Sequence, residues 1–149
     1  MSSTISSKAF LGSGLSLQIT LSPQGQLAMD MGVDGNGQMP MSSLDDHVRQ
    51  SILLILETAK GERVMRPDFG AGLQALVFSP MNAATSALVQ HEITDALTRL
   101  EPRINVLGVD VSTDPSQPGR LEITLQYSIR GTDTMFNLVY PFFLERGPY

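Results

Sequence analysis

Two segments of the chain carry apolar residues every three or four positions, the spacing that places them on one face of a helix. The first stripe consists of Leu44, Val48, Ile52, Ile55, Leu56 and Ala59, and the second of Val89, Ile93, Ala96, Leu97 and Leu100. Ser43 is suited to cap the start of the first helix, and Gly61 to end it in a left-handed conformation. Ser79 and Pro80 suit the start of the second helix, which Pro102 must end. The pattern therefore predicts two amphipathic helices.

The N-terminal part of the chain alternates apolar and polar residues, which is typical of half-buried strands. Leu15 to Leu21 alternate first, Ser22 to Gly25 form a turn signal, and Leu27 to Met31 resume the alternation. This pattern predicts a β-hairpin, which is too small to be stable without a surface to lie on. Gly32 to Ser42 is rich in glycine and predicts a linker, so we expect a domain boundary after residue 42.

After residue 104 the apolar period changes to two, which predicts three antiparallel strands. The alternation slips by one position in the first strand, so we expect a β-bulge near Leu107 and Gly108. Leu121 to Ile129 alternate strictly with polar residues and have one core face and one face toward solvent or a partner. Met135 to Phe143 is apolar on both faces, which predicts a strand that is either central or covered by another chain. The fold class is α+β, with two helices packed on a small antiparallel β-meander and an N-terminal β-hairpin arm.

Length and charge narrow the class of protein. The 149 residues suit an N-terminal extension of residues 1–42, with the hairpin and linker, followed by one core domain of residues 43–149. The net charge of −5 argues against binding to nucleic acid. The chain has no cysteine, which excludes disulfides and thiolate metal sites. No segment resembles a signal peptide or a membrane span, so we expect no direct membrane insertion and retention in the cytoplasm.

Most segments that resemble ligand or catalytic sites lack an essential part. Asp34 to Gly37 looks like part of a calcium loop, but Gly32 and Ser43 stand where that loop needs Asp and Glu. The Gly-x-Gly pairs lack the flanking elements and the lysine of nucleotide-binding motifs. His47 and His91 have no metal-ligand spacing, and no Gly-x-Ser-x-Gly sequence marks a nucleophile. The sequence therefore predicts no cofactor and no metal ion.

Glycoside hydrolysis is the enzymatic alternative that the sequence leaves open. It requires two carboxylates on either side of a sugar-binding cleft. The candidates are Glu57, Glu62, Asp68 and Glu101. The chain has no tryptophan, and its tyrosines all lie in the β region, so few rings are available near these acids to stack on a sugar. A non-enzymatic protein is therefore favoured.

Two charged corners follow the predicted helices, Gly61-Glu62-Arg63 after the first and Glu101-Pro102-Arg103 after the second. Pro102 fixes its own backbone angle and restricts Glu101, so the acidic and basic side chains are displayed rigidly. Such residues form either surface ion pairs, worth about 0–1 kcal/mol, or a buried or interfacial lock. Removing one partner of such a lock costs about 3–5 kcal/mol. The chemistry alone does not decide between the two.

Residues from about 44 to 143 resemble the W-type baseplate wedge proteins of contractile phage tails and the similar TssE component of type VI secretion systems. The resemblance rests on three motifs in this order and spacing: Gly61-Glu62-Arg63, then Pro67 with Phe69-Gly70, then Glu101-Pro102-Arg103-Ile104. The helical run from Ile52 to Thr58, Leu73, Phe78 and the β-meander add to it.

The resemblance implies a structural subunit of a baseplate, without catalysis and without a cofactor. It implies contacts with the larger baseplate wedge proteins. The residues that either make these contacts or lock the core are mainly Glu101, Pro102 and Arg103 and secondarily Glu62 and Arg63. It also implies that the first ring of sheath subunits docks on the β-meander by strand exchange, so that sheath assembly starts there. The docking strands contain Leu121, Ile123, Leu125, Tyr127, Phe136, Leu138 and Tyr140.

The family core does not account for residues 1–42. We expect this extension to pack on a neighbouring baseplate subunit or on spike or tube proteins, as in elaborate phage tails or extracellular injection particles. Assembly is expected in the bacterial cytoplasm, and the final location is the baseplate of the particle. Two alternative functions remain, a cell-wall-degrading tail hydrolase and a stand-alone adaptor protein outside any injection machine.

Overall fold

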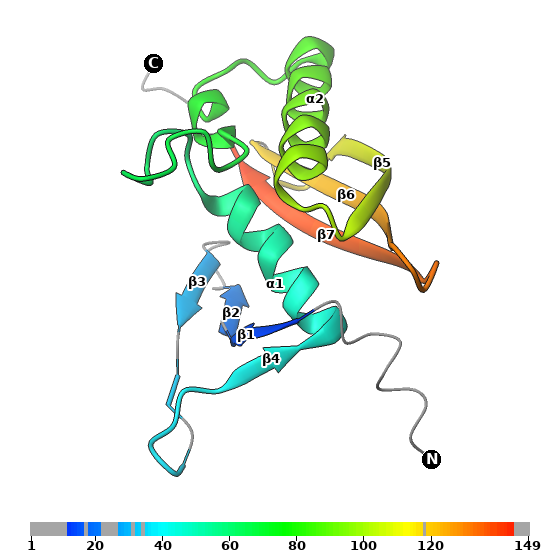
Figure 1. The fold of residues 1–149 in the computed structure, drawn as a ribbon. Coiled ribbons are helices and arrows are strands. Elements are labelled where there is room, and N and C mark those ends of the chain that lie inside the picture. The colour runs from blue at the N-terminus through cyan, green and yellow to red at the C-terminus, as the bar shows by residue number, and fades with distance from the viewer. Residues whose placement is uncertain are drawn as a thin grey trace. The chain divides into compact units, whose positions relative to one another are not determined.

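A computed structural model of the protein describes residues 12–16, 18–21, 27–30, 32–33, 35–117 and 119–144. Along the chain, four short strands precede helix α1, a 3₁₀ helix η2 and helix α2 follow, and three longer strands come last (Figure 1). This order confirms the α+β class. The chain divides into two compact units, residues 1–52 and 53–149, and the division falls inside α1.

The first unit contains two small two-stranded antiparallel sheets. β2 (Gln18–Leu21) pairs with β3 (Leu27–Asp30), which confirms the predicted hairpin. β1 (Ser13–Leu15) pairs instead with β4 (Met41–Ser43). The turn expected between the hairpin strands, at residues 22–25, lies outside the described residues.

The single strand predicted from Leu15 to Leu21 is wrong in extent. Ser16 donates its N–H to the Pro40 carbonyl at 2.7 Å and so prolongs the pairing of β1 with β4. Ile19 pairs with Met29 in the other sheet, so the two ends of the segment have different partners. The linker is shorter than predicted for the same reason, because its last residues are part of β4.

Helix α1 spans Leu44–Glu57 and has two acidic residues in its first turn, where the helix dipole favours negative charge. In the predicted stripe, Val48, Ile52, Ile55 and Leu56 are buried, whereas Ala59 lies beyond the end of the helix and is half-buried. Gly61 has the expected left-handed conformation (φ 85°), but the helix ends four residues before it. It ends early because the Ala71 N–H binds the Ile55 carbonyl at 2.9 Å, which takes the place of the next helical hydrogen bond.

Helix α2 spans Ala83–Leu100, and its predicted start at Ser79 and Pro80 is wrong. The cap is Asn82, whose Oδ1 accepts the N–H of Thr85 at 2.9 Å. Ser79 instead closes the turn after η2 (Leu73–Leu76), donating its N–H to the Leu76 carbonyl at 2.9 Å. In the predicted stripe on α2, Val89, Ile93, Ala96 and Leu97 are buried, and Leu100 is half-buried.

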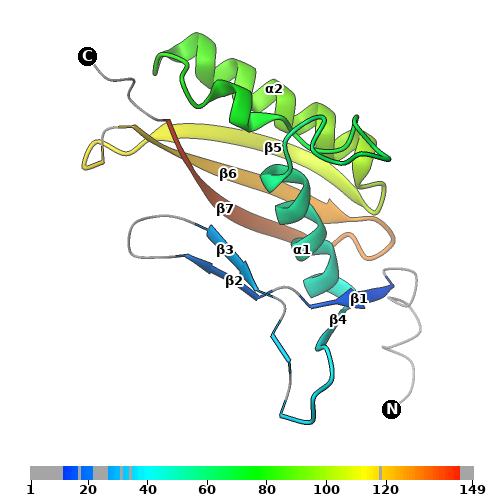
Figure 2. The ribbon, with the colours of Figure 1, turned by 90° about the vertical axis from the view of Figure 1, so that its left-hand side faces the viewer.

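The last three strands form an antiparallel sheet in the order β5 (Ile104–Thr113), β6 (Arg120–Ile129) and β7 (Met135–Phe143). The pairing register shifts between Val106 and Gly108, which confirms the predicted bulge. Helix α2 runs along this sheet and covers one of its faces (Figures 1 and 2). β7 is an edge strand of the sheet, so a central position, the first of its two predicted alternatives, is wrong.

The core of the second unit includes the space between the sheet and the buried stripe of α2. Leu121, Ile123, Leu125 and Ile129 of β6 are at most 1% exposed. Each such side chain contributes about 1.5–3 kcal/mol through its removal from water. In the described part of the chain, no helix combines the length and the apolar character needed to cross a membrane.

Candidate functional site

The acid–guanidinium corner, formed by Glu101, Pro102 and Arg103, lies where α2 meets β5. Arg103 holds the Glu101 carboxylate at both oxygens, with Nε 2.6 Å from Oε1 and Nη2 2.7 Å from Oε2. The Arg103 backbone N–H makes a third contact to Oε1 at 3.3 Å. This two-pronged geometry is the strong form of an Arg–carboxylate pair. The pair therefore closes within the chain, a point that the sequence left open.

Burial distinguishes this pair from an ordinary surface ion pair. The Glu101 side chain is 2% exposed and that of Arg103 is 22% exposed. The hydrogen bond to Glu101 raises the pKa of Arg103, so the guanidinium keeps its charge. The Arg103 carbonyl also accepts the N–H of Arg130 at 2.9 Å, which ties the corner to the end of β6. Of the two interpretations offered by the sequence, the geometry supports the buried lock.

The corner after α1 is built differently. Glu62 Oε2 accepts the N–H of Ala59 at 2.9 Å, and the Arg63 guanidinium lies over the Phe69 ring, 3.9 Å from its centroid. Glu62 and Arg63 are both exposed. Glu62 thus closes a turn, and Arg63 makes a cation–π contact. These contacts hold the loop of residues 59–72 in shape.

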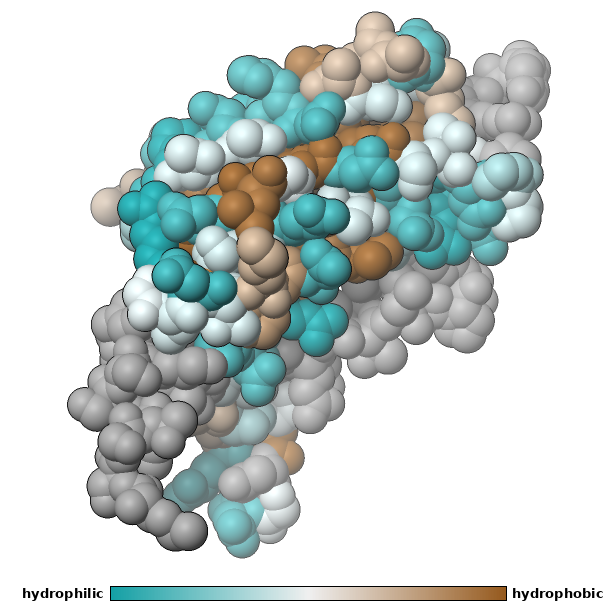
Figure 3. All heavy atoms as spheres, turned by 90° about the vertical axis from the view of Figure 1, so that its right-hand side faces the viewer, coloured by the Kyte–Doolittle hydropathy of each residue, from teal (hydrophilic) through white to brown (hydrophobic). Residues whose placement is uncertain are grey.

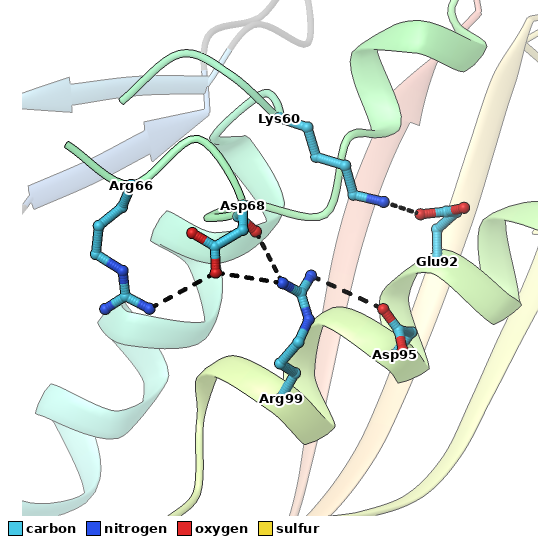
Figure 4. A network of polar contacts seen from close by, with 6 residues as sticks. All are labelled: Lys60, Arg66, Asp68, Glu92, Asp95 and Arg99. Atoms are coloured by element: carbon cyan, nitrogen blue, oxygen red, sulfur yellow. Dashed lines mark hydrogen bonds and ion pairs between the residues drawn. The ribbon is translucent and has the colours of Figure 1, made fainter. Parts of the chain in front are cut away.

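A set of charged side chains ties this loop to α2 (Figure 4). The pairs are Lys60–Glu92 (2.5 Å), Arg66–Asp68 (4.0 Å), Asp68–Arg99 (3.5 Å) and Asp95–Arg99 (3.8 Å). Arg99 Nη1 also donates to the Asp68 carbonyl at 3.0 Å. This network was not predicted from the sequence. The spacing of four residues between Asp95 and Arg99 could have predicted an ion pair on one helix. Nothing in the sequence indicated that residues of the loop would join this pair.

Gly70 lies where the loop returns to α1. Its φ is 108°, and a Cβ added there would lie 2.2 Å from the Thr58 carbonyl oxygen. Gly70→Ala is therefore expected to lower the free energy of unfolding by about 3 kcal/mol or more, as measured by urea denaturation. Gly61→Ala is the matched control, because its φ is 85° but nothing lies within 4 Å of the added Cβ. We expect it to cost about 1–2 kcal/mol. Equal losses for the two variants would contradict the role of the close approach.

The hydrogen bonds at the two ends of β7 show which of its backbone groups face away from β6. Ile129 donates its N–H to the Thr134 carbonyl at 3.1 Å, and Leu144 donates to the Gly119 carbonyl at 2.7 Å. In an antiparallel ladder the residues that bond to the neighbouring strand alternate with residues that point away from it. The second set, facing the open edge, consists of Met135, Asn137, Val139, Pro141 and Phe143.

The side chains on this second set are largely accessible. Met135 is 74% exposed, Val139 is 53% exposed, and Asn137 is also exposed. Pro141 has no N–H, and its position at the open edge leaves the ladder to β6 intact. On the side of the molecule shown in Figure 3, apolar and polar groups are interspersed rather than gathered into one broad apolar patch. Among the described residues, the open edge of β7 is therefore distinguished by backbone groups that face away from β6.

The side chains named on the predicted docking strands lie mostly in the core and not at the open edge of β7. Leu121, Ile123, Leu125, Tyr127, Leu138 and Tyr140 are buried, and Phe136 is half-buried. Tyr127 and Phe136 stack across the strands with their ring centroids 5.6 Å apart. Their side chains build the core, so these residues offer a partner little side-chain surface, and the accessible side chains of β7 are those of Met135, Asn137 and Val139. Docking of a sheath subunit stays a prediction.

Tyr140 makes a specific contact from this core to α1. Its hydroxyl donates to Glu57 Oε1 at 2.5 Å. Burial and the hydrogen bond to Glu57 raise the pKa of Tyr140, so the phenol stays protonated and remains a donor. The contact fixes the edge strand β7 to the end of α1.

The four carboxylates considered for hydrolysis have separate local partners. Glu57 accepts a hydrogen bond from the Tyr140 hydroxyl, and Glu62 accepts one from a backbone N–H. Asp68 forms ion pairs with two arginines, and Glu101 forms a hydrogen-bonded ion pair with Arg103. A glycosidase needs two such groups facing each other across a substrate, one of them free to give up a proton. The partners of these four carboxylates do not favour that role. Among the described residues, no group of three or more His, Asp or Glu side chains is arranged to hold a metal ion.

Comparison with known proteins finds relatives for most of the chain. The sequence pattern of the family described as baseplate wedge protein gp25 matches residues 42–134. Baseplate protein W of Escherichia phage P2 is 30% identical over 111 residues, which cover 74% of this chain and 94% of that protein. Baseplate wedge protein gp25 of Enterobacteria phage T4 is 34% identical over 82 residues, which cover 55% of this chain and 62% of that protein.

Solved structures with the same fold include a Geobacter sulfurreducens protein described as a tail lysozyme. It is 47% identical, with a TM-score of 0.67, over 74% of this chain and 99% of that one. A chain of the pyocin R2 baseplate after contraction is 35% identical, with a TM-score of 0.54, over 67% and 98% of the two chains. A chain of the type VI secretion baseplate complex, at 18% identity and a TM-score of 0.55, covers 66% and 91% and shares the fold.

Proposed function

This chain belongs to the baseplate wedge protein gp25 family, and we propose that it connects the inner baseplate of a contractile machine to the first ring of the sheath. In this proposal the larger wedge proteins hold the chain at the baseplate, and a sheath subunit adds a strand to β7. Sheath polymerisation then starts on the baseplate. The observation that carries the proposal is the open edge of β7, which has β6 as its one neighbour in the described part of the sheet.

Strand addition suits this edge for physical reasons. Unpaired N–H and C=O groups along an edge are a template for another chain, and native proteins usually block such edges. From Met135 to Val139, both N–H and C=O groups on the open side remain usable. Pro141 removes one donor near the far end. We therefore expect the incoming strand to pair chiefly with Met135 to Val139.

The attachment to the larger wedge proteins is proposed for the acid–guanidinium corner. Glu101 is buried and its carboxylate is held by Arg103, so its role is to fix the shape of the corner. Pro102 is exposed, and part of the Arg103 guanidinium remains accessible. These two residues are the parts of the corner that a partner can touch. Glu62 and Arg63, both exposed, are proposed as secondary contacts.

We propose that the chain has no catalytic activity of its own. The description of the Geobacter sulfurreducens relative favours cell-wall hydrolysis as a second candidate. The engaged carboxylates argue against it, since a general acid must hold and then release a proton at the scissile bond.

Residues 1–42 are proposed to contact a neighbouring baseplate, spike or tube protein, and assembly is proposed to take place in the cytoplasm before the chain reaches the baseplate.

The experiment that tests the function removes the chain from cells that produce the particle. We expect tubes and baseplates without attached sheath, because the surface that starts sheath polymerisation is missing. Electron microscopy of purified particles gives the measurement, and expression of the full chain in the same cells is the control. Normal sheathed particles would contradict the proposal. Release of peptidoglycan fragments by the purified chain, lost in Glu101→Gln, would support the hydrolase instead.

A further inference from the structure

The tip of the loop of residues 59–72 is a tight turn with an unusual composition. The Arg66 N–H donates to the Arg63 carbonyl at 3.1 Å, so Val64 and Met65 are the two central residues of a β-turn. Val64 is 93% exposed and Met65 is 91% exposed. Centres of turns usually hold glycine, proline, asparagine, aspartate or serine. We call the pair Val64 and Met65 the apolar tip.

The apolar tip is carried on a well-supported loop. Gly61 donates its N–H to the Pro67 carbonyl at 2.8 Å, which closes the base of the loop, and Phe69 donates to the Arg66 carbonyl at 3.0 Å. Asp68 is held by Arg99 of α2 through its carbonyl and its carboxylate (Figure 4). A loop fixed at its base and on one side loses little conformational entropy when a partner binds it.

Neither folding nor turn geometry explains the apolar tip. At this exposure the two side chains add almost nothing to the core, and a β-branched valine gains nothing at the centre of a turn. Single exposed apolar residues are common, but here two neighbours project together from a braced turn, and methionine and arginine are both enriched at protein interfaces. Methionine adapts readily to the shape of a pocket.

The charges around the apolar tip indicate the chemistry of its partner. Arg63 and Arg66 flank the two residues, and the guanidinium of Arg63 is held over the Phe69 ring. We propose that Val64 and Met65 insert into an apolar pocket of a second baseplate protein whose rim carries carboxylates facing Arg63 and Arg66. This inference rests on the proposed function, because the second protein belongs to the baseplate. A lipid surface is disfavoured, since two apolar residues and a chain of net charge −5 give little membrane affinity.

The test uses the full chain and, as the probe, the particle's own baseplate purified from cells that lack this chain. Val64→Ser/Met65→Ser removes the apolar tip and leaves the arginines in place. We expect binding about tenfold weaker or more, with unchanged circular dichroism, because the two side chains take no part in the core. Wild-type binding should weaken as salt is raised. Phe78→Ser is the matched control, since Phe78 is 74% exposed on a different segment, and it should bind like the wild type.

Wild-type affinity in Val64→Ser/Met65→Ser would overturn the inference while leaving the proposed function in place. An equal loss in Phe78→Ser would overturn it as well, because the effect would then be non-specific. Failure of the wild-type chain to bind the baseplate at all would overturn the proposed function and this inference with it. Binding of the wild-type chain to phosphatidylglycerol vesicles, lost in the double variant, would identify a membrane as the partner and contradict a protein pocket.

Discussion

Arg103→Met is expected to lower the free energy of unfolding by about 3–5 kcal/mol, measured by urea denaturation at neutral pH. The substitution keeps much of the apolar stem but removes the guanidinium that contacts both oxygens of Glu101. The Glu101 carboxylate would then remain in a site where the side chain is 2% exposed, and an uncompensated buried charge is costly. A loss of this size is a large fraction of the stability of an ordinary domain.

The double variant Glu101→Gln/Arg103→Met separates the charge from the packing. It replaces the carboxylate by a neutral amide of similar size, so we expect it to recover a substantial part of the stability lost in Arg103→Met. A loss below about 1 kcal/mol in Arg103→Met would mean that the pair behaves as an exposed ion pair.

Asn137→Pro is expected to abolish sheath attachment while leaving the chain folded. Asn137 points its backbone toward the open edge of β7, so a proline there removes no hydrogen bond to β6. It does remove a donor that an added strand needs, and its ring crowds the incoming backbone. We estimate a loss of about 3 kcal/mol in docking, which corresponds to a hundredfold or greater weakening. Binding of purified sheath subunits to baseplates containing the variant gives the measurement.

Two variants of the same edge serve as controls. Asn137→Thr changes the side chain but keeps the N–H, and Pro141→Thr supplies a donor near the far end of the strand. Both should attach sheath like the wild type. If Asn137→Thr were as defective as Asn137→Pro, the contact would depend on the Asn137 side chain rather than on backbone pairing. If Asn137→Pro attached sheath normally, the added strand would have to pair elsewhere.

Much of the fold of the second unit could be predicted because apolar and polar residues alternate there with a strict period. The alternation from Leu121 to Ile129 fixed which side of β6 is buried, since a slip of one residue would turn every apolar side chain to the other face. The same rule located the bulge at Leu107 and Gly108, where the phase of the pattern changes. The buried stripe of α2 followed from the helical period in the same way.

Other features depend on contacts between distant residues and could not be predicted. Ser79 and Asn82 are both good caps, and only the turn after η2 decides between them. β1 and β4 are too short to carry a pattern that identifies their pairing. Pro102 predicted a rigid corner that displays both Glu101 and Arg103, but Glu101 is 2% exposed, and its burial against Arg103 required coordinates. The apolar residues on both faces of β7 indicated that other residues cover this strand, but not whether they come from this chain or from a partner.

The central claim is that a strand of a sheath subunit completes the sheet at the open edge of β7. A cryo-EM map of the assembled particle, resolved well enough to trace backbones around this subunit, tests it most directly. We expect a strand from a sheath subunit paired along Met135 to Val139, with the pairing ending near Pro141. A map in which that edge faces solvent, or in which the sheath contacts the chain only through other surfaces, would contradict the claim.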